Sequence, residues 1–135
     1  WTRTVDELCE DGVRGEVYAH ELFSVDPGAA PHLLDAVGSV GRDRCEAIGL
    51  TAVGAYEVAM ADRSEALVIW AIPDWRTWVA YERAWESGGA LHDWSTTLRD
   101  MGGRWRRQLM VDAPLSPLRT GRQPLRSDRR PLSDL

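Results

Sequence analysis

The stretch that decides the fold is Glu-Val-Tyr-Ala-His-Glu-Leu-Phe-Ser-Val-Asp-Pro-Gly, residues 16–28. Its first ten residues are rich in aromatic and β-branched side chains, which favour a β-strand over residues 16–25. The Asp-Pro-Gly sequence at 26–28 ends this strand, and Pro31 is typical of the first turn of a helix. Apolar side chains then recur at helical spacing until Gly49. This part of the chain therefore predicts a strand followed by a helix.

The rest of the sequence extends this pattern to a complete α+β domain. A pair of strands, two helices and a last strand are expected, in chain order, at residues 50–60, 65–72, 75–87, 91–101 and 104–112. The resulting order β-α-β-β-α-(α)-β is that of the ferredoxin-like fold, βαββαβ, with an antiparallel four-stranded sheet. The first and third strands are expected at the centre of this sheet.

Three parts are expected along the chain. Residues 1–15 carry a short amphipathic pattern and predict a helical lead-in. Residues 16–113 form the ferredoxin-like domain. Residues 114–135 are rich in arginine and contain four prolines, which favour an extended tail over a helix or a central strand.

Composition limits the classes of function. The 135 residues are 44% hydrophobic and 27% charged, which fits one globular domain and excludes wholesale disorder. No apolar run approaches the roughly 18 residues that a membrane helix needs, so no membrane partner is expected. The net charge is −5 and all basic residues are arginines, five of which lie in the tail. The acidic body argues against a nucleic-acid partner, because such binding depends on neutralising phosphates.

Cysteine and histidine spacing gives no sign of a bound cofactor. Cys9 and Cys45 are too few for a disulfide scaffold and fit no metal-binding spacing. His20, His32 and His92 lack the close pairing of a zinc site. We therefore expect no metal and no other cofactor, and a reducing, cytoplasmic location.

Both sides of the first strand carry large side chains. Tyr18, His20 and Leu22 alternate with Glu21 and Phe23. The helices of a ferredoxin-like domain cover only one face of its sheet, so the other face needs a cover. The sequence therefore predicts a homodimer, or a higher homo-oligomer, that pairs through the sheet.

Several short segments resemble proteins of the NIPSNAP-like family. Residues 17–28 are similar to the opening strand and Pro-Gly turn of that family. Gly-Leu-Thr-Ala-Val-Gly-Ala-Tyr at 49–56, Ile-Trp-Ala at 69–71 and Asp-Trp at 74–75 are similar to its following strands and next helix start. Leu-Met-Val-Asp-Ala-Pro-Leu-Ser-Pro-Leu-Arg at 109–119 looks like its closing strand and Ser-Pro exit.

This resemblance implies a dimeric α/β barrel, in which two sheets pack face to face around a cavity. That superfamily includes cofactor-free monooxygenases, haem-degrading enzymes and polyketide cyclases, so the resemblance implies a fold and leaves the activity open. The family tends to place an acid, an arginine and a tyrosine along one face of the first strand, where this chain has Ala19, Glu21 and Phe23. No functional role is therefore carried over from that polar set.

Two neighbouring residues of the first strand are the candidate catalytic residues. His20 could act as a general base or ligate haem, or it could be a hydrogen-bonded histidine of the core or interface. Glu21 would suit proton abstraction if a cavity raised the pKa of its carboxyl group. On an exposed edge it would only be solvated.

Four further side chains are candidate substrate contacts, namely Tyr56, Trp70, His92 and Arg107. Tyr56 and Trp70 could line a pocket for a planar ligand or pack in the core. His92 begins the helix before the last strand, where it could lie at a cavity mouth or be exposed. Arg107 could pair with Glu21 or with an anionic substrate.

Three functions remain open from the sequence. The first is a small-molecule-binding protein for an apolar or aromatic ligand. It could be a cofactor-independent enzyme doing cyclase- or monooxygenase-like acid/base chemistry on an aromatic, polyketide-like or terpenoid substrate. The second is a non-catalytic oligomeric interaction module, and the third is a haem-binding protein. Ionisable groups converging within about 3 Å of a common point would favour the enzyme, whereas a cavity filled by the chain's own tryptophans would favour the module.

Overall fold

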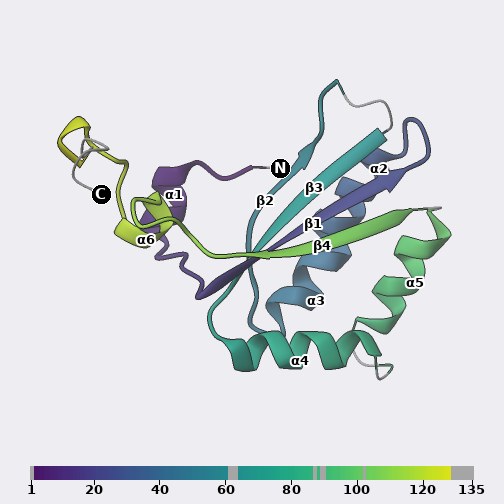
Figure 1. Cartoon of the computed structure of the whole chain (residues 1–135). Coiled ribbons are helices and arrows are strands. Elements are labelled where there is room, and N and C mark those ends of the chain that lie inside the picture. Colours follow the sequence, from purple (N-terminus) through teal and green to yellow (C-terminus); the bar gives the residue numbers. More distant parts are fainter. Residues whose placement is uncertain (1, 61–63, 87, 89–90, 102, 129–135) are drawn as a thin grey trace.

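The protein is an α+β domain built on an antiparallel four-stranded sheet of order β2-β3-β1-β4 (Figure 1). The computed structural model describes residues 2–60, 64–86, 88, 91–101 and 103–128. Its strands are β1 (Val17–Val25), β2 (Thr51–Glu57), β3 (Ser64–Ile72) and β4 (Arg104–Met110). As predicted, the first and third strands are central, and the ferredoxin-like fold is confirmed. The strands predicted at 50–60 and 65–72 leave residues 61–64 as their connection. Residues 61–63 lie outside the described residues, and β3 begins at Ser64.

One face of the sheet is covered by helices, as Figure 1 shows. They are α2 (Ala30–Ala36), the π-helical turn η1 (Val37–Gly41), α3 (Arg42–Glu46), α4 (Trp75–Glu86) and α5 (His92–Asp100). α2, η1 and α3 together replace the single helix expected after Pro31. α4 begins as predicted, because the Asp74 side chain accepts a hydrogen bond of 2.7 Å from the Thr77 backbone N–H.

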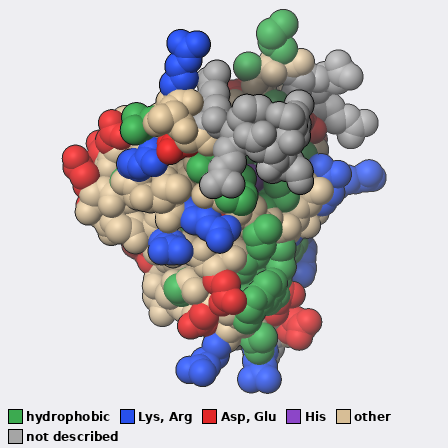
Figure 2. All heavy atoms as spheres, turned by 60° about the vertical axis from the view of Figure 1, so that its left-hand side comes forward, with side chains coloured by type: hydrophobic (Ala, Val, Ile, Leu, Met, Phe, Trp, Pro, Cys, Tyr) green, Lys and Arg blue, Asp and Glu red, His purple; other side chains and the backbone are tan. Residues whose placement is uncertain are grey.

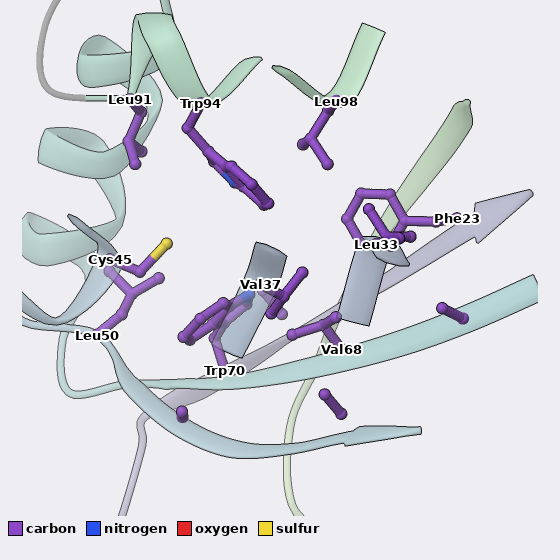
Figure 3. Packing of buried hydrophobic residues seen from close by; sticks show 14 of the residues in the cluster. Phe23, Leu33, Val37, Cys45, Leu50, Val68, Trp70, Leu91, Trp94 and Leu98 are labelled. Atoms are coloured by element: carbon purple, nitrogen blue, oxygen red, sulfur yellow. The ribbon is translucent and has the colours of Figure 1, made fainter. Parts of the chain in front are cut away.

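The main hydrophobic core lies between these helices and the sheet. Alternate residues of β1 and β3 supply its floor, among them Phe23, Val68 and Trp70. Figure 3 shows Trp94 and Leu98 of α5 pointing into the same cluster. Most of the members are less than 5% exposed, so this core is tightly closed.

In the described part of the chain, the opposite face of the sheet is covered at one end, by helices from the two ends of the chain. α1 (Val5–Glu10) and α6 (Pro117–Thr120), which we call the terminal cover, contact each other (Figure 1). Their side chains Leu8 and Leu118 join a second hydrophobic cluster, whose other members are Val13, Tyr18, Val53, Ile69 and Ala71. The lead-in helix predicted within residues 1–15 is thus present as α1.

The tail differs from the extended conformation that its prolines suggested. Residues 117–120 form α6, and residues 126–128 form the 3-10 turn η2. Pro117 occupies the first turn of α6, where its missing N–H and fixed φ are compatible with a helix. Gly121 ends this turn with a φ of 72°, a conformation that favours glycine.

No helix in the described part of the chain is long and apolar enough to cross a membrane.

Candidate functional site

A buried carboxylate at the centre of β1 organises the most polar part of the core. Glu21 is 3% exposed and faces the helices. Its Oε1 accepts hydrogen bonds from Arg107 Nε at 2.8 Å and from the Tyr81 hydroxyl at 2.9 Å. Its Oε2 accepts a hydrogen bond from Trp70 Nε1 at 2.9 Å. Both oxygens of Glu21 are therefore engaged by the chain itself.

The sheet register and α4 bring these groups together. Glu21 lies directly opposite Arg107 on β4, and opposite Val68 on β3. Side chains at directly opposite positions share a face of the sheet and lie within contact distance. Trp70 is two residues beyond Val68 and therefore points to the same face. Tyr81, which is fully buried on α4, completes the group from above the sheet.

Arg107 links this group to the surface. Its guanidinium donates to Glu21 through Nε, to the Tyr81 hydroxyl through one terminal nitrogen at 3.2 Å, and to the carboxylate of Glu82 through the other. The Arg107 side chain is 15% exposed and that of Glu82 is 41% exposed. The network thus begins in the core and ends at solvent.

Four aromatic rings surround the Arg107 guanidinium. Its Cζ atom lies between 4.7 and 5.5 Å from the ring centroids of Trp78, Tyr81, Trp85 and Trp105. A cation over such rings is stabilised by the ring quadrupoles, and more strongly when it is desolvated. We call this group of rings the aromatic cage; the chain's own arginine occupies it.

The protonation of the network follows from burial and charge. Burial raises the pKa of the Tyr81 hydroxyl well above its ordinary value, and the Glu21 charge raises it further, so Tyr81 remains a hydrogen-bond donor. For Arg107, burial alone would lower the pKa. Tyr81, Glu21 and Glu82 outweigh that effect and leave the pKa above its ordinary value. Burial also raises the pKa of the nearby Cys45 thiol, so that it stays protonated.

One polar atom of the cage lacks a partner. Trp85 Nε1 is buried and has no hydrogen-bond acceptor in the described part of the chain. The Trp85 ring packs edge-on against Tyr81, with centroids 5.9 Å apart, and lies 5.0 Å from the ring of Trp105. Burying an indole N–H without an acceptor lowers the free energy of unfolding. Trp85 Nε1 is therefore an unsatisfied hydrogen-bond donor close to Arg107.

The structure brings together three of the six residues predicted from the sequence, Glu21, Trp70 and Arg107. The pairing of Arg107 with Glu21, one of the two alternatives for Arg107, is observed. Arg107 differs in this from Arg104 and Arg106 of the same strand, which are exposed.

The other three predicted residues lie apart from this network. His20 is half-buried on the opposite face of the sheet, between Ile69 of β3 and Gln108 of β4. Tyr56 is 36% exposed on β2, across from Leu67, and His92 is exposed at the start of α5.

Sequence reasoning missed Tyr81, Glu82, Trp85 and Trp105 as members of the site. A signal was present, because Trp78, Tyr81, Glu82 and Trp85 follow the i, i+3, i+4, i+7 spacing of one helix face. A polar pair inside an aromatic stripe indicates a partner of opposite charge, here Arg107. Trp105 lies two residues before Arg107 and so shares its side of β4.

Among the described residues, no group of three or more His, Cys, Asp or Glu side chains could hold a metal ion.

The strand order and the helices on one face of the sheet define a ferredoxin-like α+β domain. Solved structures of NIPSNAP family proteins share that fold. A NIPSNAP family protein of unknown function from Agrobacterium tumefaciens superimposes with a TM-score of 0.62 at 20% identity, over 78% of this chain and 95% of that one. A NIPSNAP domain protein from Burkholderia xenovorans gives a TM-score of 0.62 at 12% identity, over 75% of this chain and 98% of that one. The NIPSNAP resemblance predicted from the sequence is thus confirmed at the level of the fold. No protein-family model matches the sequence, and no curated protein does either.

We expect the buried pair to behave as a coupled unit. Arg107→Met leaves the Glu21 carboxylate buried without its cation and should lower the free energy of unfolding by about 3–5 kcal/mol. Glu21→Met combined with Arg107→Met removes both charges and should cost clearly less than the sum of the two single substitutions. Urea unfolding followed by tryptophan fluorescence measures all three. Arg106→Met, at the exposed neighbouring position, is the control and should change little. Additive costs would show that the two charges are not coupled.

Burial lowers the pKa of His20, which predicts a pH dependence of stability. The unfolded chain, in which a histidine has a pKa of about 6.5, then binds a proton more readily than the folded chain. The free energy of unfolding should therefore fall as pH drops below about 6.5. His20→Gln should flatten this part of the profile, with His32→Gln at an exposed position as the control. Equal slopes for wild type and His20→Gln would refute the assignment.

Proposed function

We propose that the chain is a homo-oligomeric interaction module whose uncovered sheet face docks a second copy of itself. The observation that carries the proposal is the exposure of apolar side chains on the part of that face that the terminal cover leaves open. Leu22, Leu67 and Ile69 occupy its centre, with His20 beside them, and all four are only half-buried although they belong to the two central strands. Tyr56 and Met110, at its sides, are 36% and 47% exposed. An apolar face of this kind is typical of an interaction surface.

A second copy is the partner that suits this face best. In a two-fold dimer the same patch meets itself, so an apolar centre faces an apolar centre. Charged side chains border this centre: Glu65 on β3 and Arg104 on β4 lie at the end away from the terminal cover, and Arg106 on β4 lies directly opposite Leu22 at the side of the face. Both signs of charge are thus present at the rim. The NIPSNAP resemblance also implies a dimeric barrel formed through this face.

The proposal gives the Glu21 network a structural role. Both oxygens of Glu21 accept hydrogen bonds, and its carboxylate pairs with Arg107, so the chain itself already compensates its charge. Four of the chain's own aromatic rings surround the Arg107 guanidinium. Acid/base chemistry by Glu21 and haem ligation by His20 are therefore left out of the proposal. The two unpaired cysteines suit a reducing compartment.

Leu22→Lys tests the proposed docking. A lysine at the centre of the face should abolish the dimer, because a charge buried without a partner is costly at an interface. Sedimentation velocity should show a dimer for the wild type and a monomer for the variant, with unchanged circular dichroism. Val79→Lys, at a 45% exposed position of α4, is the matched control and should remain dimeric. A monomeric wild type, or a Leu22→Lys variant that still dimerises, contradicts the proposal.

A second candidate function is the binding of a small planar molecule at the aromatic cage. Two observations favour it: Trp85 Nε1 has no acceptor among the described residues, and the contacts of Arg107 there use three of its five N–H donors. A ligand that brings an oxygen acceptor between these groups would satisfy them. Aromatic walls suit a flat ligand, and Trp105 is 39% exposed at the rim.

A thermal-shift screen with aromatic carboxylates, such as benzoate and salicylate, tests this second candidate. A ligand that binds the native state should raise the melting temperature of the wild type. The rise should disappear in the doubly substituted Glu21→Met, Arg107→Met protein and persist in Arg106→Met. A rise that is equal in all three proteins, or absent from the wild type, removes this candidate.

A further inference from the structure

The ends of three strands and the terminal cover enclose a polar cleft that plays no part in the proposed docking. The cleft has a volume of about 420 Å³ and is lined by Arg14, Gly15, Glu16, Pro73, Asp112 and Arg119. Residues 14–16 precede β1, Pro73 follows β3 and Asp112 follows β4. Because β1 is antiparallel to β3 and β4, these residues lie at the same end of the strands. Its volume is within the range of about 300–1,000 Å³ that is usual for small-molecule sites.

Two arginines provide the positive side of this cleft. Arg14 is exposed and has no hydrogen-bond or ion-pair partner among the described residues. Arg119 of α6 is half-exposed, and its nearest carboxylate, that of Asp112, lies 4.0 Å away, beyond hydrogen-bond distance. Both guanidinium groups also line an adjoining cleft of about 210 Å³. Figure 2, which faces this end of the molecule, shows arginine side chains gathered near its middle.

Two carboxylates provide the negative side. Asp112 has a side chain only 14% exposed, yet among the described residues its carboxylate accepts no hydrogen bond and its one ion pair is the distant one to Arg119. Glu16 is exposed at the rim, where its backbone N–H bonds to Ile72 and its side chain is left for solvent or a ligand. A carboxylate that is largely buried and lacks a hydrogen-bond donor is unusual, because such groups are normally paired.

We propose that this cleft binds a small molecule carrying both a carboxylate and an ammonium group, that is, an α-amino acid or a close analogue. The ligand carboxylate would pair with Arg14 and Arg119, since guanidinium groups bind carboxylates in a bidentate manner. Its ammonium group would donate to Asp112 and Glu16. The two arginines and two carboxylates decide the class of ligand. The carboxylates would repel a dianion, and the arginines would repel a cation that carries no carboxylate.

The site also connects two parts of the chain. Arg14 belongs to the segment before β1, whereas Arg119 belongs to the terminal cover. A ligand held by both arginines would fix α6 against the body of the domain. Binding should therefore raise the melting temperature and protect the chain after Asp112 from proteases.

Isothermal titration calorimetry of the full chain against each standard amino acid tests the inference, with succinate and inorganic phosphate as anions that lack an ammonium group. At least one amino acid should bind, and Arg14→Gln should weaken it by about tenfold or more, as loss of a charge-assisted hydrogen bond does. Arg76→Gln, at an exposed position of α4, is the matched control and should bind like the wild type.

Three results would overturn the inference: no amino acid binds, succinate or phosphate binds as tightly as the best amino acid, or Arg14→Gln binds like the wild type. Asp112→Asn supplies a second variant. It should bind the amino acid more weakly than the wild type does, and the circular dichroism of the variant protein should be unchanged. The Leu22→Lys protein should keep this binding whether or not it is a monomer, so the cleft and the docking face can fail separately.

Discussion

The register of β4 on β1 depends on the hydrogen-bonded pair of Glu21 and Arg107, which adds a side-chain link to the backbone pairing of the two strands. β4 is an edge strand, and Arg107 is its only side chain that is not exposed. Hydrophobic burial therefore contributes little to holding this strand in place. A buried ion pair adds little net stability, but separating its members is costly. Sliding β4 by one residue would turn Arg107 to the other face and leave Glu21 buried without its cation, so the pair fixes the register.

The same pair explains the composition of α4. A guanidinium in the core needs acceptors and rings around it, and α4 supplies Tyr81, Glu82 and the two rings of Trp78 and Trp85. These residues lie on one helix face because they are three or four positions apart. Among the described residues, Trp85 Nε1 is the one fully buried side-chain nitrogen or oxygen atom without a hydrogen-bond partner.

The sequence was most informative where local chemistry decides the structure. The residue types of β1 and the order of the elements were sufficient to predict the ferredoxin-like fold and its two central strands. The alternation of β1 also showed that His20 and Glu21 point to opposite faces, but it could not show which face the helices cover. That choice depends on packing between distant elements, as do the partners of Glu21 on α4. The helical turn α6 was missed for another reason: a proline-rich segment tolerates a helix when proline stands in its first turn.

The two faces of β1 have different roles. The terminal cover lies between the proposed docking surface and the proposed ligand cleft. Glu21 faces inward and fixes β4 and α4, whereas Leu22, the next residue, faces the proposed docking surface. Tyr18, on the same face as Leu22, is already buried by the terminal cover, which limits docking to the other end of the sheet. The cleft with Arg14 and Asp112 opens at the edge beyond that cover. A second copy on the docking surface and a small ligand in the cleft therefore occupy different ends of the sheet, and neither has to displace the other.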